Sequence, residues 1–380
     1  REVAERLRAR LLNKPAIQAS EIQGQLELPV LFDDPEEPLF PSEEIDISLP
    51  SVRSYEDRQG YLDPAPIGID AKFAWTRPGG KGEGVRIIDI EKGWNFSHED
   101  LLDKVIGIVS GNNSSKETSR DHGTAVLGIL SGDQNNFGIT GIVPNALIGA
   151  VTASRFLVSN MGGWSADAIR KAANRLRKGD VIVIEQQYPG PDGEVIPAEF
   201  WSPEYDAIRF AVSRGIYVVE AAGNGGQNLD AAKYSSKFSK ASRDSGAILV
   251  GAGVPGVKPK SRSKLGFSNF GSRVDLQGWG RNIVTTGGRT GKYDDLLSLS
   301  DTNRCYTQSF DGTSGATPIV AGAVASISGI LKAANRPVLS PSEMRTLLVK
   351  HGSQQTGSQT GRQNIGPLPN LRATIESLRL

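Results

Sequence analysis

From about Tyr61 onward, short apolar runs alternate with segments whose apolar residues follow helical spacing. One helical segment is Ser165–Lys178, with Ser165 as its N-cap and Gly179 as a stop signal, and another is Pro203–Arg214, with proline in its first turn. Apolar strands separated by helices favour a mostly parallel sheet that is covered on both faces. The strand-like runs are Val85–Ile90, Ala146–Val151, Asp180–Glu185, Ile216–Ala221 and Ala247–Val250.

Candidate reactive residues fall where such a sheet binds ligands, outside the carboxyl ends of its strands. Asp89 stands at the end of the first run, and Ala221–Gly226 is a glycine-rich turn whose backbone can approach a ligand closely. Two further segments, Asp121–Leu130 and Gly312–Val320, read as helix starts with reactive groups in the first turn. We therefore expect a functional site at this edge of the sheet.

The N-terminal 60 residues follow a different pattern. Glu2–Leu12 has the spacing of a short amphipathic helix, and Leu31–Pro50 is acidic and rich in proline. Residues 1–50 hold 11 acidic and 5 basic residues, a net charge of −6, which leaves +7 on the remainder. The acidic segment is either a solvated arm or a piece that folds back on the oppositely charged remainder, in contact with residues 61–380.

Composition excludes several classes of protein. The 380 residues carry 43 Lys+Arg and 42 Asp+Glu, and a net charge of +1 does not favour a dedicated nucleic-acid binder. The single cysteine, Cys305, excludes an internal disulfide and a cysteine-based zinc site. No run of 18 apolar residues predicts a membrane span, and no secretory-signal pattern is present, so both a secreted and a cytoplasmic location stay open.

Nucleophilic chemistry would need a histidine base, because a serine hydroxyl is a poor nucleophile until a base takes its proton. The sequence has three histidines. His351 lies late in a predicted C-terminal helix and His98 in a polar turn, whereas His122 stands between an acid and a Gly-Thr pair at a helix start. His122 is therefore the candidate base.

Four segments, in chain order, resemble the aspartate, histidine, asparagine and serine motifs of the subtilisin-like serine proteases, or subtilases. The resemblance extends from about residue 61 to residue 350. Four motifs in the right order on the expected elements are far more specific than one. The segments are Ile87-Ile-Asp89, Asp121-His122-Gly-Thr-Ala-Val-Leu-Gly, Ala222-Gly-Asn224-Gly and Gly312-Thr-Ser314-Gly-Ala-Thr-Pro318.

The resemblance implies a three-layer α/β/α fold with a mostly parallel central sheet, and a serine endopeptidase. Residues 61–380 would be the catalytic domain, and residues 1–60 an extension that is either a propeptide remnant or a permanent arm. Ser314 would be the nucleophile, His122 the general base and then acid, and Asp89 the carboxylate that orients His122. Asn224 and the backbone N–H of Ser314 would stabilise the oxyanion.

Two departures from the family pattern concern the surroundings of these residues. After the aspartate, a small hydroxyl residue and glycine are usual, but Ile90, Glu91 and Lys92 stand here. The residue after the nucleophile is often Met, and here it is Gly315. Neither change removes a catalytic group, so both are expected to alter the shape of the subsites.

The family binds polypeptide substrates in extended conformation, by β-augmentation. One side of the groove would be formed by Glu185, Gln186 and Gln187, and the other by Gly162 and Gly163, with Ala222 and Gly223 beside the oxyanion motif. Glu185 could make the subsites near the nucleophile favour basic side chains. The alternative is a solvated rim charge or a charge paired with a local lysine.

The resemblance also implies a calcium ion as an optional structural cofactor, although the chemistry itself would require none. Gly132–Gly141 resembles a calcium loop of the family, in which Asn135 and Asp100 would supply side-chain oxygens. Carbonyl oxygens of Asp133, Phe137 and Ile139 would complete the set. A loop that needs no ion is the alternative.

Two other functions use the same framework. An acyl-enzyme can transfer its acyl group to an amine and so ligate or cyclise peptides with the same triad. A catalytically idle subtilase-like protein would keep the peptide groove without the chemistry, although the four intact motif residues speak against it. Product mass separates hydrolysis from ligation, because only hydrolysis adds water.

Overall fold

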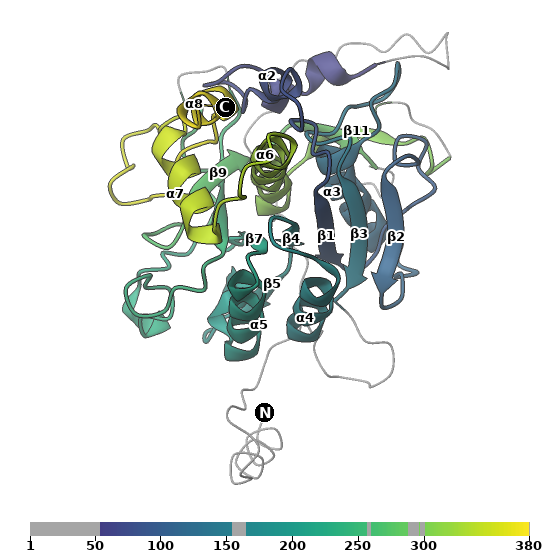
Figure 1. The fold of residues 1–380 in the computed structure, drawn as a ribbon. Coiled ribbons are helices and arrows are strands. Elements are labelled where there is room, and N and C mark those ends of the chain that lie inside the picture. Colours follow the sequence, from purple (N-terminus) through teal and green to yellow (C-terminus); the bar gives the residue numbers. More distant parts are fainter. Residues whose placement is uncertain (1–53, 154–164, 257–259, 288–295, 297–300, 380) are drawn as a thin grey trace.

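Seven parallel strands form the central sheet of the computed structural model, which describes residues 54–153, 165–256, 260–287, 296 and 301–379 (Figure 1). The strand order is β2-β3-β1-β4-β7-β8-β9, so β1 and β4 are neighbours in the middle of the sheet. The strands are β1 (Arg86–Glu91), β2 (Val105–Ser110), β3 (Leu147–Thr152), β4 (Val181–Ile184), β7 (Tyr217–Ala221), β8 (Ile248–Gly253) and β9 (Leu276–Trp279).

Each face of the sheet carries its own core, as the three-layer prediction requires. Alternate residues of one strand enter different cores: Ile87 packs with the helices α3 (Glu117–Ser131) and α6 (Thr313–Ala333), whereas Ile88 and Ile90 pack with α4 (Ser165–Arg175) and α5 (Ser202–Ser213). This alternation follows from the twofold period of a strand. The predicted α/β/α fold is confirmed (Figure 1).

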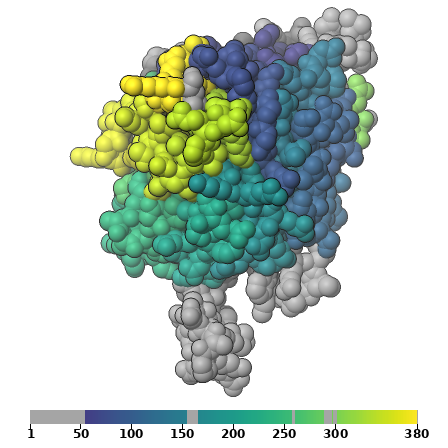
Figure 2. Space-filling model, in the orientation of Figure 1, coloured from purple at the N-terminus to yellow at the C-terminus, as the bar shows by residue number. Residues whose placement is uncertain are grey.

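Smaller elements complete the described structure. The helices α2 (Ala71–Trp75) and α8 (Leu371–Ser377) lie side by side at the surface, near α7 (Pro341–His351) (Figure 2). Two antiparallel hairpins consist of β5 (Gln187–Pro189) with β6 (Val195–Pro197), and of β10 (Ile283–Thr286) with β11 (Tyr306–Phe310). Short 3₁₀ helices are Glu56–Arg58, Gly60–Leu62, Ala198–Phe200 and Ala232–Tyr234.

Helix α6 is the buried centre of the larger core. It is the one helix among the described residues that is long and apolar enough to cross a membrane, and its apolar window is 100% buried within the protein. The apolar residues that the sequence places at helical spacing after Ser314 therefore pack against the sheet and α3.

The described chain already packs on the domain before the predicted boundary at residue 60. Tyr55 is buried and its backbone N–H donates to the Gly138 carbonyl at 2.6 Å. The buried Gln59 side chain donates to the Thr140 carbonyl and accepts from the Thr140 N–H. The remainder of the predicted extension lies outside the described residues.

One predicted helix start differs from the structure. The pattern suggested that the helix of the histidine motif begins at Asp121, whereas α3 begins at Glu117, which places His122 in the second turn. The turn before Asp121 is polar, so the apolar pattern does not reveal it.

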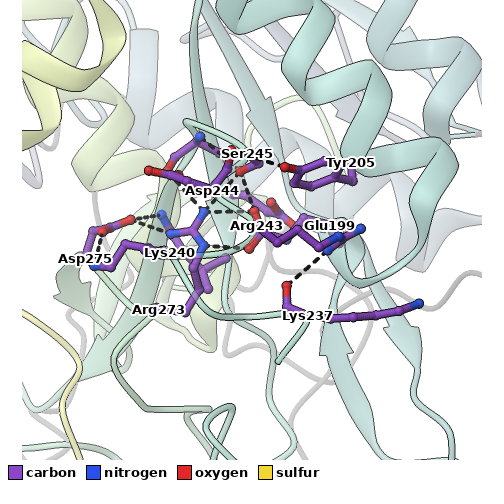
Figure 3. Close-up of polar contacts among 12 residues, drawn as sticks. Glu199, Tyr205, Lys237, Lys240, Arg243, Asp244, Ser245, Arg273 and Asp275 are labelled. Atoms are coloured by element: carbon purple, nitrogen blue, oxygen red, sulfur yellow. Dashed lines mark hydrogen bonds and ion pairs between the residues drawn. The ribbon is translucent and has the colours of Figure 1, made fainter. Parts of the chain in front are cut away.

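A buried ion cluster connects the 3₁₀ helix Ala198–Phe200 to the residues just before strand β9 (Figure 3). The fully buried Arg273 donates to both carboxylate oxygens of Glu199, at 2.6 and 2.8 Å, and to Asp275 at 2.6 Å. Burial lowers the pKa of the Arg273 guanidinium, but the charges of Glu199 and Asp275 raise it above its ordinary value. The cluster therefore keeps a charged arginine in the interior.

Replacement of Arg273 by Met should lower the free energy of unfolding by about 3–5 kcal/mol, because it leaves the buried Glu199 without its cation and Asp275 with only the partly exposed Lys240. Urea denaturation at neutral pH measures this difference. The matched control is Arg209→Met at an exposed position of α5, with an expected change within about 0.5 kcal/mol. A loss below about 1 kcal/mol for Arg273→Met would contradict the assignment.

Candidate active site

The predicted catalytic residues gather at the carboxyl ends of β1 and β7 and at the start of α6. Asp89 is the fourth residue of β1, His122 lies in α3, and Asn224 follows β7. Ser314 is the second residue of α6. The fold therefore brings together the motifs that the sequence presents far apart.

His122 is buried and lies against a carboxylate that the sequence analysis did not single out. Its Nδ1 is 3.2 Å from Oε1 of Glu91, the last residue of β1. Its ring packs edge-on against Phe310, with centroids 5.5 Å apart. In the described structure neither ring nitrogen makes a hydrogen bond with acceptable geometry: Nδ1 faces Glu91 as a close contact only, and Nε2 is open to a substrate or nucleophile proton.

Asp89, which was predicted to orient His122, makes its hydrogen bond elsewhere. The Trp94 indole N–H donates to Asp89 Oδ2 at 2.7 Å, while within the described part of the chain Oδ1 has no partner. Burial and then the neighbouring charge of Glu91 hold the pKa of Asp89 well above its usual range. The contact with His122 thus belongs to Glu91 in this structure.

Gly123 of the histidine motif has a packing role beside Asp89. A Cβ at this position would lie 2.2 Å from the Gly93 carbonyl oxygen and 2.7 Å from Trp94 Cδ1. Only glycine lets α3 approach the turn after β1 closely enough for the indole to reach Asp89.

Asn224 presents an unused donor to the site. Its Oδ1 accepts hydrogen bonds from the Thr313 N–H at 2.9 Å and from the Thr313 hydroxyl at 3.0 Å. These two bonds fix which end of the amide points away from α6. The Nδ2 group is buried and has no partner among the described residues, as expected for a donor that waits for an oxyanion.

Ser314 stands beside this donor in the first turn of α6. Its hydroxyl is fully buried and has no hydrogen bond with acceptable geometry in the described structure. A Cβ on Gly315 would lie 2.2 Å from Ile283 Cδ1. This atom is the end of a flexible side chain that can move aside, so the packing does not by itself account for glycine after the nucleophile.

The predicted substrate residues are in part structural. Gln187 accepts the Asn224 N–H at 3.0 Å, and Gln186 donates to the Ile90 carbonyl. Ala222 is held by the Asn269 amide, which donates to its carbonyl at 2.7 Å. The adjacent Gly223 has a φ of +93°, where a side chain would be strained. Gly162 and Gly163 lie outside the described residues.

Glu185 is buried and not a rim charge, and no lysine of the described residues pairs with it. It follows β4, is fully buried, and neither carboxyl oxygen has a hydrogen bond with acceptable geometry in the described residues. Burial, followed by the charges of Asp89 and Glu91, raises its pKa well above the ordinary value. The Ser314 hydroxyl lies beside the carboxyl and lowers the pKa by less. The solvated-rim alternative is wrong.

His98, the second histidine of the N-terminal half, has the contacts of a structural residue. His98 is buried, and its Nε2 lies 2.8 Å from the Cys305 carbonyl oxygen. Burial lowers its pKa to about 4, so it stays neutral near pH 7. This arrangement fits a structural histidine and leaves His122 as the candidate base.

The predicted calcium loop brings Asp100 and Asn135 together, but they bind each other. Asn135 Nδ2 donates to Asp100 Oδ1 at 2.6 Å, and the Ile139 N–H donates to Oδ2 at 2.7 Å. Asn135 Oδ1 accepts from the Phe137 N–H. These oxygens already accept protein hydrogen bonds, so in this arrangement they do not fit a calcium ion. The arrangement favours the alternative of a loop that needs no ion.

Sequence reasoning missed Glu91, Trp94 and Thr313 as parts of the site. Glu91 had a usable signal: residues i and i+2 of a strand share a face, so Glu91 had to lie on the same face as Asp89. The contacts of Trp94 and Thr313 had no such signal, because they join segments that meet only in the folded chain.

Comparisons with known proteins identify the family of the chain. The profile of the Subtilase family matches residues 82–365. Thermitase of Thermoactinomyces vulgaris is 31% identical over 300 residues, which cover 78% of this chain and 90% of thermitase. The major intracellular serine protease of Bacillus subtilis (strain 168) is 28% identical over 289 residues, or 74% of this chain and 80% of that protein.

Solved structures share the fold. A cold adapted subtilisin-like serine proteinase superposes with a TM-score of 0.54 at 23% identity, over 76% of this chain and 89% of that chain. Fervidolysin from Fervidobacterium pennivorans superposes with a TM-score of 0.62 at 21% identity, over 87% of this chain and 48% of that chain. With the family profile covering most of the sequence, the chain belongs to the subtilase family and is a serine endopeptidase.

Proposed function

We propose that the chain hydrolyses peptide bonds through an acyl-enzyme on Ser314. The Ser314 Oγ attacks the carbonyl carbon, and its proton passes to His122 Nε2. The same proton then goes to the leaving amine as the C–N bond breaks. Water repeats the sequence on the ester, which releases the acid and restores Ser314.

The unpartnered Nδ2 of Asn224 is the observation that carries this proposal. A buried N–H donor without a partner costs stability, so its retention beside Ser314 needs a reason. The negative oxygen of the tetrahedral intermediate would satisfy it, together with the backbone N–H of Ser314 at the N-terminus of α6.

We propose Glu91 as the carboxylate that contacts His122 directly, with Asp89 as a second carboxyl behind it. The 3.2 Å separation between Glu91 Oε1 and His122 Nδ1 supports this assignment, although the family pattern points to Asp89. A carboxylate at Nδ1 holds the imidazole in the tautomer whose Nε2 can accept the serine proton.

Labelling by a serine-directed fluorophosphonate tests the nucleophile. We expect one adduct on Ser314, located by mass spectrometry, and none on Ser314→Ala, because only an activated hydroxyl reacts with the reagent. Ser213→Ala, at an exposed position of α5, is the matched control and should label like the parent. An unlabelled parent, or equal labelling of Ser314→Ala, would refute the proposal.

Glu91→Gln and Asp89→Asn should separate the two carboxyls. We expect Glu91→Gln to lower kcat/KM by about 10³–10⁴, the order expected when an uncharged group replaces the carboxylate at the histidine Nδ1. Asp89→Asn should cost about tenfold, since it alters a neighbour of that contact. The reverse order of the two losses would assign the direct contact to Asp89.

Chelation tests the predicted calcium loop. We expect the melting temperature in EDTA and in Ca²⁺ to agree within about 1 °C, because a cation stabilises only a native state that binds it. Asn135→Ala should lower the melting temperature equally in both, since it removes a donor from the buried Asp100 carboxyl. A melting temperature that rises with Ca²⁺, and does so no longer in Asn135→Ala, would show that the loop rearranges around the ion.

A further inference from the structure

Three carboxyl groups share one face of the sheet beneath Ser314. In the parallel register of β1 with β4, Asp89 is opposite Val183 and Ile90 is opposite Ile184. Glu91 and Glu185 each stand one position beyond that last pair, so they lie side by side. Asp89 lies one pleat away on the same face, and all three side chains are fully buried.

Little positive charge among the described residues balances these three carboxyl groups. The charges that act on the Glu185 carboxyl are those of Asp89 and Glu91 from β1, and the Ser314 hydroxyl from α6 lies beside it. His122 of α3 lies against Glu91 through its Nδ1. Among these described groups, only His122 can carry a positive charge.

We propose that Glu185 is a positioning residue that acts in its uncharged form, in which its carboxyl O–H donates a hydrogen bond to Ser314 Oγ. This inference rests on the proposed function, because it assigns a role at the same nucleophile. A neutral Glu185 orients a lone pair of Oγ and leaves the serine proton free for His122 Nε2. No proton is consumed, since Glu185 keeps its own throughout the cycle.

Ionisation of Glu185 would oppose the reaction in two ways. The carboxylate would accept the Ser314 hydroxyl proton as a hydrogen bond and direct it away from His122. It would also place a negative charge beside the site where the oxyanion develops. The raised pKa of Glu185, caused by burial and then by Asp89 and Glu91, keeps the neutral form in place. A neutral group has no charge to attract Arg or Lys, so this role replaces the hypothesis of basic specificity.

The test is the pH dependence of casein hydrolysis by the full chain between pH 5 and pH 10, for the wild type, Glu185→Gln and Glu204→Gln. Glu204 is a matched control because it is a buried glutamate of α5, on the opposite side of the sheet. We expect kcat/KM of the wild type and of Glu204→Gln to fall at alkaline pH by about tenfold per pH unit. Glu185→Gln, which is always neutral, should stay within about twofold up to pH 10.

Two results would overturn the inference. One is an alkaline fall in Glu185→Gln equal to that of the wild type. The other is a loss of kcat/KM of tenfold or more in folded Glu185→Gln near pH 6, because the amide N–H keeps a neutral donor beside Ser314 Oγ. Fluorophosphonate labelling separates the two proposals: labelled Ser314 with either result overturns this inference alone, and an unlabelled wild type overturns the proposed function with it.

Stability supplies a readout independent of activity. A carboxyl whose pKa is raised in the folded state binds more protons there than in the unfolded state, so its contribution to stability falls as pH rises above the ordinary glutamate value. The urea midpoint of the wild type should therefore fall with pH relative to that of Glu185→Gln, starting near pH 5. Parallel curves would contradict the neutral state that the proposal requires.

Discussion

Two hydrogen bonds from Thr313 to the Asn224 side-chain oxygen set the relation between the nucleophile and its oxyanion donor. They join the loop after β7 to the first turn of α6, two segments that no local sequence pattern connects. Further hydrogen bonds support this link. Gln187 holds the Asn224 backbone, Asn269 holds the Ala222 carbonyl, and both positions depend on the β5–β6 hairpin. Loss of any of these hydrogen bonds would move Asn224 Nδ2 relative to Ser314.

The molecule accommodates buried carboxyls in two different ways. Behind the hairpin, Arg273 pairs with both Glu199 and Asp275. At the active site, no described cation pairs with Asp89 or Glu185, and their pKa values rise. The first arrangement joins two segments of the fold through opposite charges. The second arrangement leaves protons on carboxyl groups whose charge can change with pH. This suits a site where charge develops and disappears during the reaction.

Glycine-dependent contacts connect the motifs to the packing. Gly123 was visible as a motif position, but the reason for glycine is spatial, because a Cβ would collide with the Gly93 carbonyl oxygen and with Trp94. The strands and helices themselves were largely predictable, because β1 and β4 contain short apolar runs and the apolar residues of α6 follow helical spacing. The start of α3 was missed, since its first turn is polar and carries no apolar signal.

The sequence by itself determined the order of the elements, the face on which each strand residue lies, and the identity of Ser314, His122 and Asn224 as candidates. Strand alternation even placed Asp89 and Glu91 together. Only the tertiary structure decided that Glu91 reaches His122 and that Glu185 lies beneath Ser314. The physical reason is that the register between β1 and β4 is set by the packing of the whole sheet against two layers of helices. No local period encodes that register, and a shift of one residue would have turned Glu185 to the opposite face.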